Sequence, residues 1–155
     1  MSDVSQNSSP PTAAASSCRL VPELNCRDFA RSFAFYCDVL GFAPAFQRPE
    51  HRFAYLEREG VELMLEELTD DPDFTWRTGE LEVPFGRGIN FQIEVSDLDS
   101  LLQSLSRHGV KLRREPWKAW YRADDHENGQ RQFLVQDPDG YLLRFCQDLG
   151  ERPLQ

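Results

Sequence analysis

The chain repeats one order of elements. A strand-like run is followed by a helix-like stretch and three further strand-like runs, and residues 89–95 begin the same order again. Asp28 and Asp97, near the starts of the two helix-like stretches, are 69 positions apart, and Gly41 and Gly109, past their ends, are 68 apart. An internal repeat of this kind predicts an α+β chain built from two βαβββ modules.

Hydrophobic spacing supports both halves of this prediction. Large apolar side chains recur at three- and four-residue intervals in the two helix-like stretches: Phe29, Phe33, Tyr36, Cys37 and Leu40 in the first, and Leu98, Leu101, Leu102 and Leu105 in the second. The strand-like runs alternate instead, so that Ile89, Phe91, Ile93 and Val95 oppose Asn90, Gln92 and Glu94. Each sheet then has an apolar face for its helix and a mixed polar face, and we expect curved mixed sheets around a cleft.

Composition sets the boundaries. We predict a disordered tail at 1–18, one domain at 19–149 and a short C-terminal tail at 150–155. Within the domain, the first module spans 19–68, a linker 69–86 and the second module 87–149. Residues 117–122 (WKAWYR) lack clear strand periodicity, and we place Trp117, Trp120 and Tyr121, like Trp76, in loops at the rim of the cleft.

The charge excludes some partners. With 26 acidic and 17 basic side chains the net charge is −9, which disfavours nucleic acids and anionic membranes. It favours a cationic partner or reflects a soluble surface. The sequence shows no export signal or spanning segment, and its four cysteines have no CxxC pairing, so we expect free thiols and a cytoplasmic protein.

Three segments together resemble a known family. They are similar to the vicinal oxygen chelate superfamily, which includes glyoxalase I, extradiol dioxygenases and the bleomycin resistance proteins. Within the superfamily, the chain most resembles the bleomycin resistance proteins. The three segments are VPELNCRDFARSFAFYCDVLGF, FAYLEREGVELMLEEL and QFLVQDPDGYLLRF. The resemblance implies paired βαβββ modules around a cleft. In the metalloenzymes of the family, the first, fourth, fifth and eighth strands each supply a His, Gln or Glu ligand. Here those positions fall on Val21, Met64, Asn90 and Arg144, so we predict neither a metal nor another cofactor.

The resemblance also implies a function. Bleomycin resistance proteins sequester a large cationic drug with planar heteroaromatic rings and do not change it chemically. They act as homodimers with clefts between chains, in which the N-terminal strand can be exchanged. We therefore expect a small-molecule binder rather than an enzyme. The alternatives are a metal-dependent glyoxalase-type lyase or isomerase, and a metal-free binder of another small molecule.

Such a ligand calls for aromatic faces and carboxylates. The predicted ligand-binding residues are Phe53, Tyr55, Glu62, Met64, Glu66, Trp76, Asn90, Gln92, Trp117, Trp120, Tyr121 and Arg144. Other interpretations stay open. The strand aromatics fit half-buried positions equally well, the glutamates fit a solvent-facing surface, and the WKAWYR cluster fits a dimer contact. Arg144 fits an ion pair with Glu66 or Glu94 as well as a ligand contact.

Overall fold

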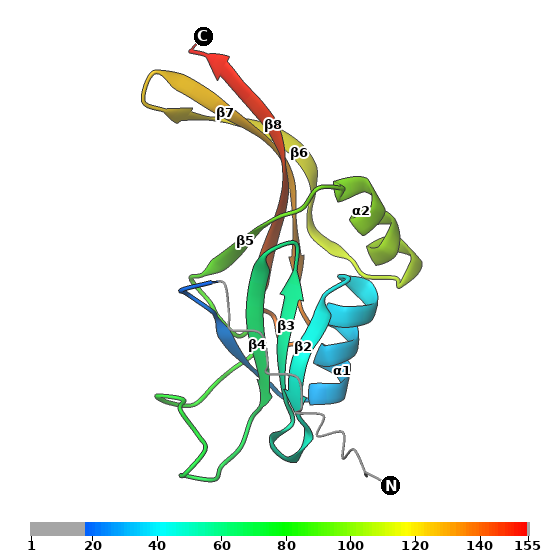
Figure 1. The fold of residues 1–155 in the computed structure, drawn as a ribbon, viewed down its shortest axis with the longest axis vertical. Coiled ribbons are helices and arrows are strands. Elements are labelled where there is room, and N and C mark those ends of the chain that lie inside the picture. Colours follow the sequence, from blue (N-terminus) through cyan, green and yellow to red (C-terminus); the bar gives the residue numbers. More distant parts are fainter. Residues whose placement is uncertain (1–17, 155) are drawn as a thin grey trace, which may run out of the picture.

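The computed structural model describes residues 18–154, which form two four-stranded sheets, each with one helix (Figure 1). Sheet A has the order β1-β4-β3-β2 and sheet B the order β5-β8-β7-β6. The first module contains β1 (Glu23–Cys26), α1 (Phe29–Ala34), a π-helical turn (Phe35–Val39), β2 (Ala43–Arg48), a 3-10 turn (Pro49–His51), β3 (Phe53–Arg58) and β4 (Val61–Glu67). The second contains β5 (Asn90–Glu94), α2 (Leu98–Arg107), β6 (Leu112–Ala123), β7 (His126–Gln136) and β8 (Leu142–Pro153).

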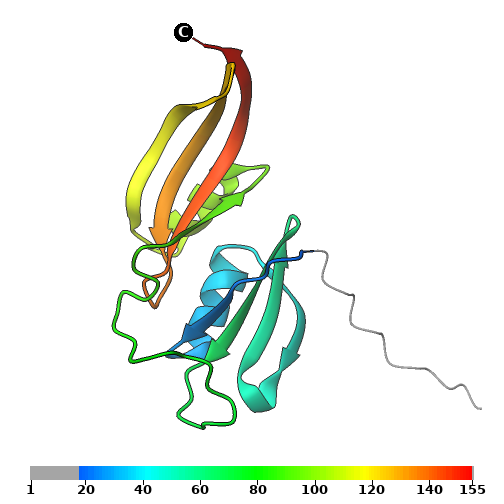
Figure 2. The ribbon, with the colours of Figure 1, turned by 90° about the vertical axis from the view of Figure 1, so that its left-hand side faces the viewer.

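The two sheets share one topology, which confirms the predicted fold class. In each sheet the first strand pairs in parallel with the fourth, and the other neighbours are antiparallel. The modules are stacked along the long axis, and both helices lie on the same side of their strands, the right-hand side in Figure 1 and behind the strands in Figure 2. Among residues 18–154, no helix lies on the opposite face of either sheet.

Local sequence explains where the helices begin and end. The Asp28 carboxylate accepts a hydrogen bond from the Arg31 amide at 3.0 Å, and Asp97 does the same for Ser100 at 3.0 Å. These bonds satisfy backbone donors that the first helical turn leaves free. After the helices, Gly41 and Gly109 take φ values of 74° and 67°, a left-handed conformation that glycine adopts without steric cost.

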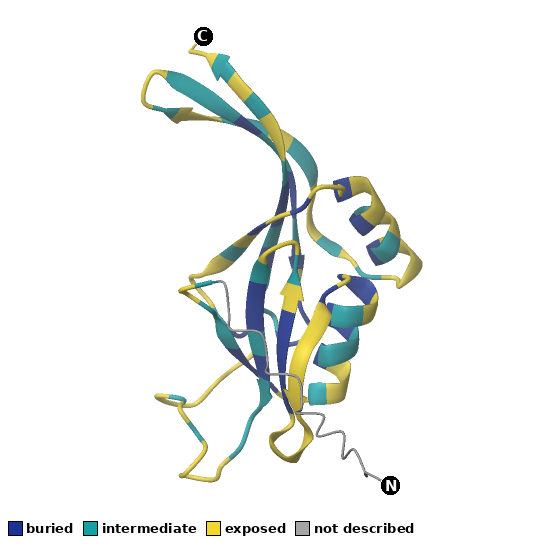
Figure 3. Ribbon diagram, viewed as in Figure 1, coloured by how far each residue is buried: buried dark blue, intermediate teal, exposed yellow. Residues whose placement is uncertain are grey.

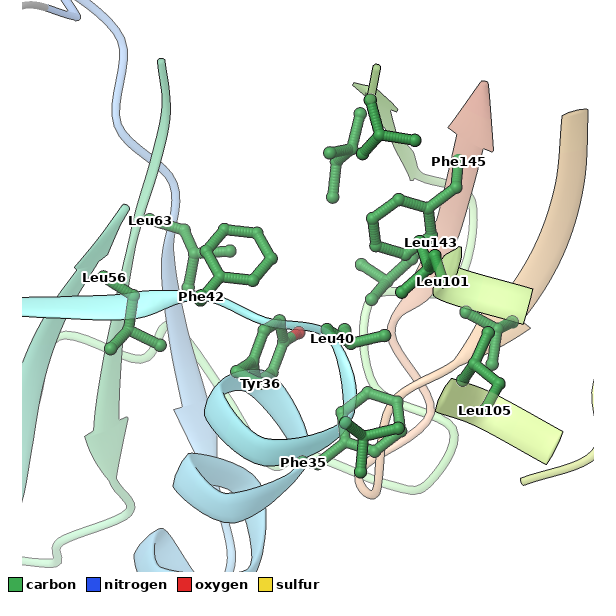
Figure 4. Close-up of a cluster of buried hydrophobic side chains, with 14 of the residues drawn as sticks. Phe35, Tyr36, Leu40, Phe42, Leu56, Leu63, Leu101, Leu105, Leu143 and Phe145 are labelled. Atoms are coloured by element: carbon green, nitrogen blue, oxygen red, sulfur yellow. The ribbon is translucent and has the colours of Figure 1, made fainter. Parts of the chain in front are cut away.

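One hydrophobic core runs through both modules. It joins the apolar stripes of the helices to the inner sides of both sheets (Figures 3 and 4). Leu40 of the first module and Phe145 of the second are both fully buried within it. In Figure 4, Phe35 and Leu40 lie on the side of the first module that faces Leu101 and Leu105 of α2. The two modules therefore stabilise each other by shared apolar burial.

A buried polar network also joins the modules. The turn between β7 and β8 carries Asp137 and Asp139, which are 6% and 2% exposed. Asp139 accepts hydrogen bonds from Arg27 Nε at 2.7 Å and Ser32 Oγ at 3.1 Å, and Asp137 accepts one from the Tyr36 hydroxyl at 2.9 Å. Burial raises the pKa of the Asp137 carboxyl to about 6. The turn of sheet B is thus anchored on α1 of the first module.

The last three strands are longer than we expected. β6 runs from Leu112 to Ala123, so the prediction that the WKAWYR segment is a loop is wrong; Asp124 and Asp125 instead form the turn into β7. β8 continues to Pro153, so residues 150–153 belong to a strand and not to a C-terminal tail. The three strands project beyond the core as an arm at the top of Figure 1. The predicted disorder of residues 1–17 lies outside the described residues.

Candidate functional site

Strand alternation and register define an outer face on each sheet, turned away from the helices. Face A, the outer face of sheet A, carries Glu23, Asn25, Phe46, Arg48, Phe53, Tyr55, Glu57, Glu62, Met64 and Glu66. Face B, the outer face of sheet B, carries Asn90, Gln92, Glu94, Arg114, Trp117, Tyr121, Gln130, Gln132, Leu134, Arg144 and Cys146. Eleven of the twelve predicted ligand-binding residues lie on these faces or contact them.

Face A has an aromatic centre. The Phe46 ring stacks on Tyr55 with centroids 5.0 Å apart and lies 6.0 Å from Phe53. The Arg48 guanidinium covers the Phe53 ring at 3.9 Å. Phe53 is only 1% exposed and Tyr55 9%, whereas Phe46 is 37% exposed. The aromatic surface open to a ligand is therefore mainly that of Phe46, which the sequence analysis missed. Pairing the strand of Phe46 with the predicted strand of Tyr55 would have placed Phe46 on the same face.

Carboxylates surround this aromatic centre. The Tyr55 hydroxyl donates to the Glu62 carboxylate, and Trp76 Nε1 donates to Glu66 Oε2 at 2.7 Å. Trp76 belongs to the segment between the two sheets and is 45% exposed, so this bond brings a second open aromatic ring to face A. Burial and the nearby Glu66 raise the pKa of Glu23. Face A therefore combines open aromatic rings with clustered acid groups.

Face B has a different chemistry. Arg144 donates through its terminal nitrogen to Gln92 Oε1 at 2.5 Å, and the Gln132 amide contacts the Tyr121 hydroxyl. These four residues come from all four strands of the sheet. Within residues 18–154, Arg144 forms this bond to an amide and no ion pair with Glu66 or Glu94. The ion-pair interpretation of Arg144 is therefore wrong for this part of the chain.

The aromatic side chains of β6 are divided between two sides of sheet B. Trp117 and Tyr121 lie on face B, and the Arg114 guanidinium covers the Trp117 ring at 3.7 Å. Trp120 lies on the other side, where it packs on Gly129 and under the Arg152 guanidinium at 4.2 Å. A methyl group on Gly129 would come within 2.7 Å of the Trp120 ring. Trp120 is therefore a packing residue of the arm and does not share a face with the other predicted site residues.

The four positions that the resemblance assigns to metal ligands carry a mixed set of side chains. β1 begins at Glu23, and the register pairs Glu23, not Val21, with Met64. The corrected set is then a carboxylate, a thioether, the Asn90 amide and the Arg144 guanidinium. A thioether is a soft ligand and a guanidinium repels cations, so this set does not suit a hard divalent ion. Residues 18–154 hold no group of three or more His, Cys, Asp or Glu side chains that could bind a metal.

A family model identifies the class of protein. The model of the Glyoxalase/Bleomycin resistance protein/Dioxygenase superfamily matches residues 19–145. The chain therefore belongs to this superfamily, in agreement with the resemblance and with the paired βαβββ modules.

Individual relatives narrow the comparison. The chain is 30% identical over 138 residues to a "Bleomycin resistance protein" from Geobacillus stearothermophilus, covering 83% of this chain and 96% of the relative; one from Staphylococcus aureus strain N315 matches equally well. TioX from Micromonospora sp. ML1 has a similar structure, with a TM-score of 0.65, 24% identity and coverage of 84% and 98%. Lactoylglutathione lyase from Agrobacterium tumefaciens has a TM-score of 0.57, 18% identity and coverage of 84% and 93%. The two structures share the fold with this chain. Among the described helices, none is long and apolar enough to cross a membrane.

Proposed function

We propose that this chain is an antibiotic-binding protein that sequesters bleomycin-type cationic glycopeptides without changing them chemically. The observation that carries the proposal is face A, where open aromatic rings stand among carboxylates. The relatives at 30% identity, which are bleomycin resistance proteins by name, support the same class of ligand.

The binding mechanism follows from the chemistry of face A. Planar rings of the drug stack on the exposed rings of Phe46 and Trp76, whose faces attract both aromatic and cationic groups. The Glu66 carboxylate draws the cationic part of the drug toward these rings, and Glu62, which is only 8% exposed, adds negative charge to the same face. Because ions screen charges that face solvent, we expect affinity to fall as salt rises.

The proposed binding requires no chemical reaction on the drug. The enzymes of the superfamily that are metal-dependent need a cluster of hard ligands, whereas the equivalent positions here include Met64 and Arg144. Since lactoylglutathione lyase shares the fold, catalysis has to be tested directly. Metal content of the purified protein is the first measurement, and stoichiometric zinc, nickel or manganese would favour the lyase alternative.

We also propose a homodimer in the cytoplasm. Phe46, Trp76 and Tyr121 are each more than a third exposed on the two outer faces, and a second copy of the chain would cover part of this apolar surface. The four cysteines, all within residues 18–154, form no disulfide there, which suits a reducing compartment. Analytical ultracentrifugation tests the dimer, and a monomer at micromolar concentration would contradict it.

Isothermal titration with bleomycin tests the main proposal. We expect one drug per chain, with weaker binding at high salt and no product in chromatography of the released drug. A matched variant is Phe46→Leu, which keeps an apolar side chain but removes the aromatic ring, and it should bind more weakly. The absence of binding heat at micromolar wild-type protein would overturn the proposal.

A further inference from the structure

Two buried polar atoms of face B lack a partner. Within residues 18–154, Gln132 Oε1 and Arg144 Nε are the buried side-chain nitrogen or oxygen atoms that make no hydrogen bond. The Gln132 side chain is completely buried. Leaving such a group unpaired is unfavourable, and most buried polar groups in proteins are satisfied. Two such atoms on one face indicate a place where an outside molecule completes the bonding.

The two residues that carry these atoms are neighbours on face B, and each is held by one bond. Gln132 pairs with Cys146 across β7 and β8, and Arg144 is two residues from Cys146 on the same face, so Gln132 and Arg144 are diagonal neighbours. The other end of the Gln132 amide contacts the Tyr121 hydroxyl, and the terminal nitrogen of Arg144 donates to Gln92. Each side chain is thus held by one bond and has one buried polar atom without a partner.

We propose that this pair binds a neutral carboxamide group of the ligand. The carboxamide oxygen accepts a hydrogen bond from Arg144 Nε–H, and its N–H donates to Gln132 Oε1. The inference deepens the proposed function, on which it rests for the nature of the ligand. It divides recognition between the sheets: face A binds the cationic aromatic part, and face B a neutral amide part.

The two unpaired atoms select against charged groups. A carboxylate would accept a hydrogen bond from Arg144, but it has no hydrogen to donate to the carbonyl oxygen of Gln132. An ammonium group would donate to Gln132, but the Arg144 guanidinium would repel it. A carboxamide has both a donor and an acceptor and carries no charge. It can therefore satisfy both atoms at once.

Tyr121 controls access to this pair. Gln132 has no exposed surface, whereas the Tyr121 ring in contact with its amide is 43% exposed. A ligand therefore reaches Gln132 when the Tyr121 ring rotates outward into solvent. Trp117 and Leu134, next to Gln132 and Arg144 in the register, provide apolar walls that strengthen hydrogen bonds by excluding water.

Small probes and side-chain NMR test the proposal without the drug. The ¹⁵N-labelled full chain is titrated with acetamide to about 200 mM, and in parallel with acetate and methylammonium, because one small group binds weakly. We expect acetamide to shift both the Arg144 Nε–Hε and the Gln132 side-chain signals with one saturation curve. Acetate and methylammonium should not shift the two signals together.

Variants assign the effect to these residues. Gln132→Leu should weaken acetamide binding, followed at Arg144, by about fivefold, the value of one hydrogen bond. Gln130→Leu, on the same strand and face, is the matched control and should bind as the wild type does.

Three results would overturn the inference: no shift at Arg144 and Gln132 with acetamide, a stronger response to acetate than to acetamide, or equal weakening by Gln132→Leu and Gln130→Leu. These results are independent of the main proposal. Bleomycin binding without an acetamide response would remove only the carboxamide site, whereas an acetamide response without bleomycin binding would remove only the proposed drug.

Discussion

Sheets A and B have the same strand order but opposite chemistry on their outer faces. Face A holds four glutamates and one arginine around stacked aromatic rings, whereas face B holds amides, two arginines and one glutamate. The strands also differ: those of sheet A have four to seven residues, and β6, β7 and β8 have 11 or 12.

This difference shows what the repeat constrains. The inner sides of both sheets must pack on helices, so their apolar pattern is repeated in both modules. The outer faces carry no such requirement and can differ without loss of the fold. Ligand chemistry can therefore be divided between two copies of one module.

The largest expected effect tests whether face A contributes to stability. Phe53 is 1% exposed beneath Arg48, so Phe53→Ala should lower the free energy of unfolding by about 3 kcal/mol. Trp117→Ala, at a partly exposed ring on face B, should cost clearly less. Urea denaturation measures both, and an equal loss would show that the aromatic centres of the two faces are equivalent.

The second prediction concerns the connection between the modules. The folded-state pKa of Asp137 is about 6, above the ordinary value of 3.8, so the folded protein binds this proton more tightly than the unfolded chain. The stabilisation that protonated Asp137 contributes is fully present below pH 3.8 and is lost as the pH rises through about 6.

We therefore expect the wild type to lose roughly 2 kcal/mol more than Asp137→Asn between about pH 4 and pH 7. Denaturation curves at several pH values provide the measurement. The Asp73→Asn variant changes an exposed carboxylate in the segment that connects β4 and β5, and its stability should depend on pH as that of the wild type does. The same slope in Asp137→Asn and in the wild type would contradict the assignment.

The third prediction isolates the charge of face A. Glu66→Gln keeps an acceptor for Trp76 Nε1 but removes the negative charge, and we expect about tenfold weaker bleomycin binding, or about 1.4 kcal/mol. The salt dependence should also become shallower. Glu80→Gln, at an exposed position in the segment that connects β4 and β5, is the control. Unchanged affinity in Glu66→Gln would remove this carboxylate from the binding mechanism.

The smallest effect tests the arm of sheet B. Arg152 covers the Trp120 ring at 4.2 Å and bonds Glu127 at 2.7 Å, on a partly exposed surface. Arg152→Ala should lower the free energy of unfolding by about 1 kcal/mol and leave bleomycin binding unchanged. Arg113→Ala changes an exposed arginine of β6 and should have less effect on stability than Arg152→Ala. Weaker drug binding in Arg152→Ala would return Trp120 to the candidate site.

Much of the architecture was predictable because its signals are local. Apolar spacing located α1 and α2, Asp28 and Asp97 marked their first turns, and alternation separated inner from outer side chains of β5. The candidate site was predicted in part. Alternation placed Phe53, Tyr55, Glu62 and Glu66 on one face, but Phe46 and Gln132 were missed because their surroundings depend on neighbouring strands.

The sequence by itself determined two βαβββ modules, their helix ends and the acidic character of the chain, since these follow from periodicity, capping and composition. Only the tertiary structure decided that Glu23 faces Met64, that Trp120 turns away from Trp117 and Tyr121, and that Gln132 and Arg144 retain unpaired atoms. Strand register and bulges set these positions. A shift of one residue moves a side chain to the opposite face, and register depends on partners far away in the sequence.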